Sequence, residues 1–453
     1  MGREAIVAAV KAAGVVGAGG AGFPTHIKLT ASADTIIVNG AECEPLLEVD
    51  RQLLSLYRHE VLKGLEAARI AIGARQAHLA IKGKYKSLVD ELKMAAASRP
   101  WLEIATLPDI YPIGDEQCLV YEVLGRIVPP RGIPIDVGAV VLNVETLYNI
   151  ARAIDGKPVI DTFVTVSGAV AEPATWQVPV GCAIQDVLSW ARPLYDPASL
   201  AVIEGGPMMG DLVKELQSPV TKTTKGLVVL PQNHVLATRL KAKQIVLSRA
   251  FSVCSQCSLC TDLCPRHQLG HPIWPHRIMR SLAGDGVLDL EVGRGALLCS
   301  ECGVCDQYAC FMGLSPRRVN QALKQELLGK GSNGQSSGAE STFSWLQEVR
   351  QGFHESQVPA RRLLYRLDLA RWAKAAPLKG FLPEPARVVI PLKQHVGKPA
   401  HCLVQVGDVV SRGDLLADLP EGEFGAFVHS SITGVVSAIE GGTVVIERGG
   451  QGE

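Results

Sequence analysis

The sequence predicts a multidomain α/β protein in which two mixed domains precede a helical cysteine-rich segment and a small C-terminal β-barrel. Three observations predict this class. The chain has 453 residues, more than one ordinary domain holds. Eight of its 12 cysteines lie within residues 254–310, and short strands separated by glycine turns fill the chain from about residue 384. We therefore expect domains at 1–155, 156–225, 226–328 and 384–453, with a linker and a helix at 329–383.

Composition argues against several classes of partner. The chain carries 45 Lys+Arg and 45 Asp+Glu residues, so its bulk charge gives no reason to expect nucleic acid or an acidic membrane surface. The sequence contains no run of about 18 apolar residues, so it predicts no membrane span. The N-terminus also lacks the pattern of a signal peptide. We therefore expect a cytoplasmic protein, in which crowded cysteines indicate metal binding rather than disulfides.

The first domain starts with a glycine-rich loop at residues 14–28. Its glycines allow backbone turns that other residues avoid, and they leave N–H groups accessible to a phosphate. A helix predicted around Ile6, Val7 and Val10 precedes the loop, so the loop is not a Rossmann fingerprint, which follows a strand. Taken alone, it fits a flexible turn equally well.

Polar residues follow the strand-like runs of this domain. An apolar strand at 35–38 leads into Asn39, Glu42 and Glu44, and further polar groups stand at Asp115, Glu116, Asn143 and Thr146. The carboxyl ends of parallel strands meet at one edge of a sheet, where ligands of α/β proteins bind. Each acid taken singly fits a solvated loop, but together they predict a ligand site.

The two cysteine groups have the spacing of a protein with two iron–sulfur clusters. The first group reads C-x2-C-x2-C-x3-C-P, in which three thiolates bind one [4Fe–4S] cluster and the fourth binds the neighbouring cluster. The second group has one extra residue before its last cysteine and no proline directly after it. The swapped rule assigns one cluster to Cys254, Cys257, Cys260 and Cys310, and the other to Cys299, Cys302, Cys305 and Cys264.

A pair of zinc sites is the alternative for these cysteines. Zinc needs four donors, which two C-x2-C pairs supply, and the third cysteine of each group would then have no role. The helix-like spacing of Ile273, Ile278, Met279 and Leu282 would hold the two cysteine loops together. The isolated cysteines are expected to be small core residues rather than ligands; they are Cys43, Cys118, Cys182 and Cys402.

The remaining segments predict small modules. Strand, turn, strand, helix and glycine turn between 163 and 210 suggest a β-grasp domain, either ligand-binding or purely a packing unit. Residues 329–342 have the composition of a flexible linker, and residues 361–374 predict an exposed helix packed on the cysteine segment. The repeated Gly-Asp turns after 384 resemble a biotinyl/lipoyl-type barrel, but the tip at Ser430 has no lysine, so we expect no swinging-arm cofactor.

The glycine loop, the Asn39–Pro45 segment and the Asn143–Thr146 segment resemble the FMN domain of two families. These are the flavoprotein subunit of respiratory complex I and the RnfC-type subunit of Rnf electron-transport complexes, in which a ligand-binding β-grasp (SLBB) domain follows. The resemblance implies that Gly17, Gly19, Gly20, Gly22 and Lys28 surround the FMN phosphate, with Asn143 and Thr146 on the same side. It implies that Asn39, Glu42 and Glu44 lie near the ribityl chain or the ring, and Asp115 and Glu116 near flavin and nicotinamide. Ala18 and Ala41 replace charged residues of complex I, which leaves FMN better supported than NADH.

The order of the domains, with the barrel last, resembles the cobalamin reductases of propanediol-utilisation microcompartments (PduS type). This resemblance implies FMN and two [4Fe–4S] clusters as cofactors, NADH as electron donor and a corrinoid as substrate. It also implies a corrinoid adenosyltransferase and a microcompartment shell protein as partners, and a location inside the microcompartment. Two alternatives remain open at this point: an Rnf-like subunit that exchanges electrons between NADH and ferredoxin, and an electron conduit without flavin.

Overall fold

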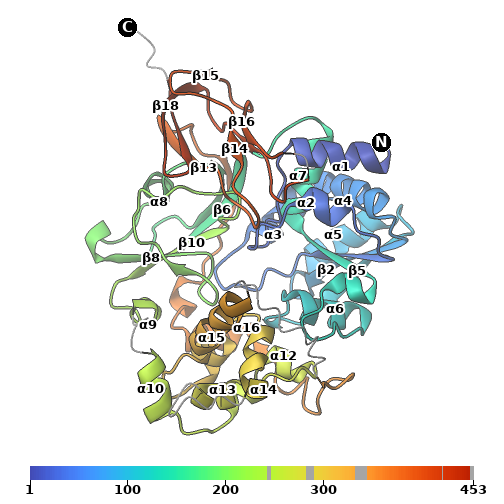
Figure 1. Ribbon diagram of the computed structural model, residues 1–453, viewed down its shortest axis with the longest axis vertical. Helices are drawn as coiled ribbons and strands as arrows, with labels where there is room; N and C mark the ends of the chain where they lie inside the picture. Colours follow the sequence, from blue (N-terminus) through green and yellow to red (C-terminus); the bar gives the residue numbers. More distant parts are fainter. Residues whose placement is uncertain (242–245, 282–289, 332–343, 421, 449–453) are drawn as a thin grey trace.

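The computed structural model describes residues 1–241, 246–281, 290–331, 344–420 and 422–448 (Figure 1). The N-terminal domain (blue to cyan) and the domain built on the strands between residues 161 and 231 (green) lie side by side. The helical, cysteine-rich segment lies against one end of both, and the C-terminal strands lie at the opposite end. Within the described ranges, every helix is too short or too polar to cross a bilayer. Most of the predicted linker at 329–342 lies outside the described residues.

The N-terminal domain is built on a parallel four-stranded sheet. Its order is β3-β2-β1-β5, and every neighbouring pair is parallel. Three of these strands, β1, β2 and β5, consist mostly of buried residues, as expected where a parallel sheet is covered on both faces, whereas the edge strand β3 is more exposed. Their bounds are β1 (Thr35–Asn39), β2 (Gln76–Lys82), β3 (Leu102–Leu107) and β5 (Ala139–Asn143).

Helices cover both faces of this sheet. Side chains alternate along β1, so Ile36 and Val38 lie in one hydrophobic core and Ile37 lies in the core on the other face. The second core contains Leu119 and Val120 of α6, and the other long helices contribute to the first. The helices are α1 (Arg3–Ala12), α2 (Thr25–Leu29), α3 (Val49–Leu56), α4 (Arg58–Ile72), α5 (Lys86–Ala96), α6 (Glu116–Leu124) and α7 (Val144–Ile154), with the 3-10 turn η1 (Pro134–Val137).

The second domain has a mixed sheet of order β12-β7-β6-β10-β8-β9. Its central pair, β6 and β10, is parallel, β6 and β7 are antiparallel, and α8 contributes to the core, as expected for a β-grasp domain. The sheet continues past residue 225, the expected end of this domain, because β10 pairs with both β6 and β8. Its elements are β6 (Asp161–Gly168), β7 (Ala174–Pro179), α8 (Ile184–Ala191), η2 (Pro197–Ser199), β8 (Leu200–Glu204), β9 (Asp211–Leu212), β10 (Gly226–Pro231) and β12 (Leu378–Phe381).

The cysteine-rich part is a set of short helices around a small core. Ile273, Ile278 and Met279 are buried there, as their spacing predicts, whereas Leu282 lies outside the described residues. The elements are α9 (Val235–Lys241), α10 (Val246–Val253), α11 (Leu259–Asp262), α12 (Pro265–Gln268), α13 (Pro275–Ser281), α14 (Leu290–Arg294), η4 (Gly295–Leu298), the π-helical turn η5 (Val304–Ala309) and α15 (Pro316–Gly331).

The helix predicted at 361–374 is shorter and more buried than expected. The helix α16 (Ala360–Arg366) ends because Asp368 takes a left-handed conformation with φ of 55°, and a 3-10 turn η6 (Ala370–Trp372) follows. Leu363, Leu367 and Leu369 lie in the core of the β-grasp domain, which also includes Cys302 of the cysteine segment. Just before α16, strand β11 (Val358–Pro359) pairs with β4 (Ile110–Tyr111) of the first domain.

The C-terminal domain consists of two small sheets around one core. Its turn at Ser430 and Ser431 is fully buried, and Ser431 Oγ donates to the carbonyl of Val180 at 2.5 Å, so this turn packs on the β-grasp domain. The first sheet contains β13 (Arg387–Pro391), β19 (Thr443–Glu447), β18 (Gly434–Glu440) and β15 (Val409–Val410), and the second contains β14 (His401–Cys402), β16 (Leu415–Asp418) and β17 (Val428–His429).

Candidate functional site

The glycine-rich loop connects α1 to α2 and presents an exposed tip. The amide of Gly22 donates to the carbonyl of Gly17 at 3.2 Å, which closes the loop. Gly20 and Gly22 have φ values of 115° and 64°, in the left-handed region that favours glycine. In the described part of the chain, the amides of Gly19, Gly20 and Ala21 make no hydrogen bond. These donors are available to a phosphate, so the loop fits the group that the resemblance implies.

The loop lies against the start of α7. The amide of Ala18 donates to Thr146 Oγ1 at 3.0 Å, and a Cβ on Gly19 would lie 3.6 Å from the Cβ of Asn143. Asn143 caps α7, because its Oδ1 accepts from the amide of Glu145 at 2.9 Å. The positive end of this helix dipole therefore lies beside the glycine loop, where it favours an anion.

Asn39 joins two of the predicted segments at the carboxyl edge of the sheet. It is paired in register with Asn143 on the adjacent strand. Its Oδ1 accepts from the amide of Ala41 at 3.2 Å, and its Nδ2 donates to the carbonyl of Gly114 at 2.9 Å. The loop after β1 is thereby held against the loop that carries Asp115, and the polar residues gather at this edge as the strand pattern led us to expect.

Three acidic side chains lie in a low-dielectric region beside this edge. Burial raises the pKa of Glu42, raises the pKa of Glu44 to about 7, and raises the pKa of Asp50 well above its ordinary value. Lys225 opposes the shift at Glu42 and Asp50, and Lys82 also opposes it at Glu42. Carboxyl groups that hold protons near neutral pH can donate hydrogen bonds as well as accept them, which suits a site for a polar cofactor.

The remaining predicted residues are Asp115, which has structural partners, and Lys28 and Glu116, which pair with each other near the surface. Asp115 caps α6, with Oδ1 accepting from the amides of Gln117 and Cys118, and its Oδ2 accepts from Arg266 Nη2 at 2.8 Å. Both oxygens therefore have structural partners, and the second ties the first domain to the cysteine segment. Lys28 Nζ lies 3.2 Å from Glu116 Oε1, and both side chains are partly exposed. Roles of these residues towards flavin or nicotinamide stay predictions.

One cavity near the surface gathers four thiols from both cysteine groups. Phe311 and Met312, which also line it, are 61% and 38% exposed. The four thiols in the lining are those that the swapped rule assigns to one cluster, namely Cys254, Cys257, Cys260 and Cys310.

The extra residue of the second cysteine group is absorbed by a π-helical turn. In the first group, the amide of Leu263 donates to the carbonyl of Leu259 at 3.1 Å, four residues back, within the turn that leads to Cys264. In the second group, the amide of Cys310 donates to the carbonyl of Cys305 at 3.1 Å, five residues back. A π turn contains one more residue than an α turn. Cys310 therefore reaches the shared cavity despite the insertion.

The other four thiols lie deeper. Cys264, Cys302 and Cys305 are buried, and Cys299 is half-buried. Burial raises the pKa of Cys264 to about 12, and the nearby Cys299 adds to the rise. Burial also raises the pKa of Cys305, followed by Asp306 and then by the thiols of Cys299, Cys302 and Cys264. Cys264 therefore lies near thiols of the second group as well as near Cys260 of its own group.

The spread of the thiols suits clusters better than zinc. Within the described ranges, no three His, Cys, Asp or Glu side chains converge to hold a single metal ion. A zinc ion needs four donors within about 2.0–2.3 Å, whereas each thiolate of a [4Fe–4S] cluster binds a different iron atom. Thiols arranged around a cavity therefore fit a cluster. Of the isolated cysteines, Cys118 and Cys182 are buried as predicted, whereas Cys43 and Cys402 are partly exposed.

The first domain and the cysteine segment meet at Tyr111. This residue is 2% exposed, and its hydroxyl donates to the carbonyl oxygen of Cys302 at 2.6 Å. The same hydroxyl lies 3.5 Å from Glu44 Oε1. The carboxylate of Glu44 accepts from the amides of Met208 and Met209, both at 2.9 Å. A predicted flavin residue is therefore one hydroxyl group away from a predicted cluster ligand.

Sequence reasoning did not identify the residues that make this junction. The sequence patterns assigned no role to Tyr111 or Arg317, and Arg266 follows the first cysteine group without a pattern of its own. Each arginine follows the last cysteine of one group by a few residues. This position was the signal in the sequence that could have marked Arg266 and Arg317 as neighbours of the thiols. Their acidic partners lie far away in the chain or on another turn, so the pairing could not be read from spacing.

Comparisons with known families match three parts of the chain. Residues 10–152 match the family described as Nuo51 FMN-binding domain, and residues 253–315 match the 4Fe-4S dicluster domain. Residues 372–451 match the RnfC barrel sandwich hybrid domain. The chain therefore contains an FMN-binding domain, an iron–sulfur domain and a barrel-type domain in the predicted order, and the predicted fold class is confirmed.

Two relatives match almost the whole chain, and a third matches part of it. The chain is 44% identical over 444 residues to the cobalamin reductase PduS of Salmonella typhimurium, covering 97% of this chain and 96% of the relative. It is 43% identical to the protein of the same name in Citrobacter freundii, with the same coverage. It is also 34% identical over 273 residues to a component of the Na⁺-translocating ferredoxin:NAD⁺ oxidoreductase complex of Acetobacterium woodii, covering 59% of each chain.

Proposed function

Because this chain belongs to the family of the cobalamin reductases PduS, we propose that it transfers electrons from NADH to the cobalt of a corrinoid. Oxidation of one NADH to NAD⁺ and a proton releases two electrons. These balance two one-electron reductions of cobalt, from cob(III)alamin to cob(II)alamin or from cob(II)alamin to cob(I)alamin. A two-electron donor and a one-electron acceptor need carriers between them, and the FMN-binding and iron–sulfur domains supply the sites for such carriers.

The residues at the carboxyl edge of the first sheet fit FMN. Bound FMN would supply the conversion of a two-electron transfer into single electrons, and bound clusters would supply one-electron conduction. The amides of the loop that contains Gly17, Gly19, Gly20 and Gly22 would hold the phosphate, next to Asn143 and Thr146. Lys28 would add a positive charge, and the partly buried Glu42 and Glu44 would bind polar groups of the flavin.

Two [4Fe–4S] clusters complete the proposal. We assign the near-surface cluster to Cys254, Cys257, Cys260 and Cys310, which line one cavity, and the buried cluster to Cys264, Cys299, Cys302 and Cys305. The thiols must be deprotonated to bind iron, and burial alone opposes that, since it raises the pKa of Cys264 to about 12. Bound iron would offset this cost, as metal ions do for coordinating thiols.

The single observation that carries the proposal is the hydrogen bond between Tyr111 and the carbonyl of Cys302 at 2.6 Å. It joins the FMN-binding domain directly to a loop that carries the buried thiols. Because Glu44 lies on the other side of the same hydroxyl, the flavin site and the buried cluster site are neighbours. Residues that would hold FMN therefore lie next to residues that would hold the buried cluster, so the bound groups would supply a short path for single electrons.

The setting follows from the proposed reaction. Cob(I)alamin is the form of cobalt that adenosylation requires, so the partner that uses the product is a corrinoid adenosyltransferase. We propose that the protein acts inside a bacterial microcompartment, in contact with a shell protein, as its resemblance to the PduS type implies.

An anaerobic assay with purified protein tests the function. We expect NADH oxidation to depend on cob(III)alamin or cob(II)alamin, with two cobalt reductions for each NADH. Replacement of Cys302 by alanine should abolish cobalamin reduction while flavin content stays unchanged. NADH oxidation coupled to ferredoxin and not to cobalamin would instead favour an Rnf-like role. Clusters without any flavin released on denaturation would favour a simple electron conduit.

A further inference from the structure

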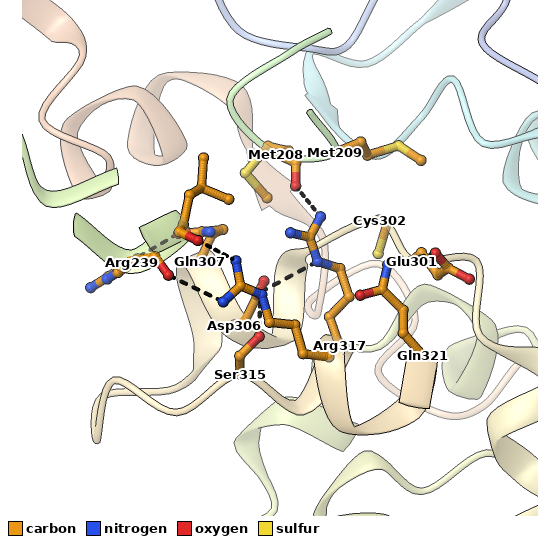
Figure 2. A network of polar contacts seen from close by, with 12 residues as sticks. Met208, Met209, Arg239, Glu301, Cys302, Asp306, Gln307, Ser315, Arg317 and Gln321 are labelled. Carbon is orange, nitrogen blue, oxygen red and sulfur yellow. Dashed lines mark hydrogen bonds and ion pairs between the residues drawn. The ribbon is translucent and has the colours of Figure 1, made fainter. Parts of the chain in front are cut away.

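Three parts of the chain meet at the turn of residues 205–210 between β8 and β9. On one side, its amides at Met208 and Met209 bind the carboxylate of Glu44. On the other side, the carbonyl of Met208 accepts from Arg317 Nη1 at 2.5 Å (Figure 2). The turn also packs directly on the second cysteine group, since a Cβ on Gly303 would lie 2.6 Å from the oxygen of Met208. The turn therefore lies between the flavin site and the buried thiols.

Arg317, at the start of α15, is the buried cation at this junction. Its side chain is 6% exposed, and its Nε lies 3.4 Å from Asp306 Oδ2, whose side chain is 5% exposed. Asp306 directly follows Cys305, and its Oδ2 also accepts from Ser315 Oγ at 2.8 Å (Figure 2). These contacts hold the guanidinium between the 205–210 turn and the loop that carries Cys305, a predicted cluster ligand.

Arg317 pairs with the buried carboxylate of Asp306 and lies near other acidic groups. Burial by itself lowers the pKa of Arg317, but the nearby Asp306, Cys305, Tyr111 and Glu44 outweigh burial and raise it. An arginine keeps its charge even when it is buried, and in a region of low dielectric the field of that charge is weakly screened. A charge held in this way changes the energy of any other charge placed next to it.

We propose that Arg317 is a positioning residue for electron transfer, which fixes the 205–210 turn and raises the reduction potential of the buried cluster. The inference rests on the proposed function, because it takes the four buried thiols as cluster ligands. Reduction adds one negative charge to a cluster, and a neighbouring cation stabilises that charge. Asp306 acts in the opposite direction, because its carboxylate follows the ligand Cys305. Removal of either charge therefore shifts the potential, with opposite signs.

The near-surface cluster should not respond in the same way. Arg317 and Asp306 are absent from the lining of the cavity that holds Cys254 and Cys310. The next residue, Arg318, offers a matched control on the same helix. It donates to the carbonyls of Arg239 and Leu240 and makes no contact with the turn among the hydrogen bonds of the described residues. Because Arg318 also lies near Asp306, it tests whether the position of the charge beside the turn matters.

The experiment is a mediated redox titration of the anaerobic holoprotein, followed by electron paramagnetic resonance. It needs neither NADH nor cobalamin, so its failure is distinct from failure of the proposed function. Arg317→Gln should lower the midpoint potential of one cluster and leave the other unchanged at full iron content. Asp306→Asn should raise the same potential, Arg317→Lys should restore most of the original value, and Arg318→Gln should change neither cluster by a comparable amount.

Repeating the titration in a Cys257→Ala background, where only the buried cluster is expected, identifies which signal moves. A shift of both clusters, no shift in Arg317→Gln, or an equal shift in Arg318→Gln would overturn the proposal. If Arg317→Gln loses iron, Arg317→Lys and Asp306→Asn decide the question. Asp306→Asn without a rise in potential would then refute the electrostatic role.

Discussion

Cys264 offers the sharpest test of the site, because its assignment depends on the fold rather than on its own cysteine group. It follows Cys254, Cys257 and Cys260 in sequence, but its electrostatic neighbours include Cys299 of the second group. We expect Cys264→Ala to remove the buried cluster and to keep the near-surface one. Because each cluster contains four irons, iron should fall from about eight to about four atoms per chain.

Double variants turn this expectation into a choice between two pairings. If Cys264 and Cys302 bind the same cluster, the double variant Cys264→Ala/Cys302→Ala keeps about four irons, as each single variant does. Cys264→Ala/Cys257→Ala should then lose both clusters. Effects of two residues on one shared unit do not add, whereas effects on separate units do.

The assay is iron and sulfide analysis of anaerobically purified protein, with electron paramagnetic resonance after dithionite treatment. Cys182→Ala is the matched control, since this buried cysteine belongs to neither group and should leave about eight irons. Retention of about four irons by Cys264→Ala/Cys257→Ala, with near-complete loss in Cys264→Ala/Cys302→Ala, would show that each group holds its own cluster. The swapped assignment would then be wrong.

Two further predictions concern lysines. Lys28→Ala should lower the flavin released on denaturation several-fold while iron stays at about eight atoms per chain. Replacement of the exposed Lys63 by alanine should change neither value. Equal loss of flavin and iron in Lys28→Ala would refute the separation of the two sites. Burial lowers the pKa of Lys222 to about 7, so between that pH and about 10 the unfolded chain binds one more proton than the folded chain. The free energy of unfolding should therefore rise with pH in this window by up to ~1.4 kcal/mol per unit. In denaturant titrations, Lys222→Met should lose this pH-dependent contribution and the exposed Lys374→Met should keep it. Equal dependence of the unfolding free energy on pH in all three proteins would contradict the prediction.

Sequence patterns predicted those elements whose structure depends on residues close together in the chain. The spacing of Ile6, Val7 and Val10 predicted α1, and the apolar run at 35–38 predicted β1, because side-chain periodicity determines which face is buried. Polar residues after strand-like runs predicted a carboxyl edge of a parallel sheet, and the structure places Asn39 and Asn143 opposite each other at the ends of two adjacent parallel strands. The cysteine spacing predicted that three thiols of the first group would meet the last thiol of the second, and Cys254, Cys257, Cys260 and Cys310 line one cavity. Their role as cluster ligands stays a prediction.

Prediction failed where a backbone conformation or a distant partner decides the structure. The helix expected at 361–374 ends early because Asp368 is left-handed, which no periodicity reveals. The sequence showed the extra residue before Cys310 but not the π turn of η5 that accommodates it, because spacing alone does not reveal the hydrogen-bond pattern of a turn. The Asp115–Arg266 ion pair joins residues 151 positions apart and has no local signature.

The glycines of the junction show how such a long-range contact is nevertheless encoded. A Cβ on Gly206 would overlap the carboxylate of Glu44, and a Cβ on Gly303 would press on the carbonyl of Met208. Both positions therefore require the absence of a side chain because another part of the chain approaches closely. In the sequence, the first glycine belongs to a turn pattern and the second to a cysteine motif. Their shared cause is the junction itself, where the 205–210 turn fits between Glu44 and the second cysteine group because Gly206 in the turn and Gly303 beside it carry no side chain.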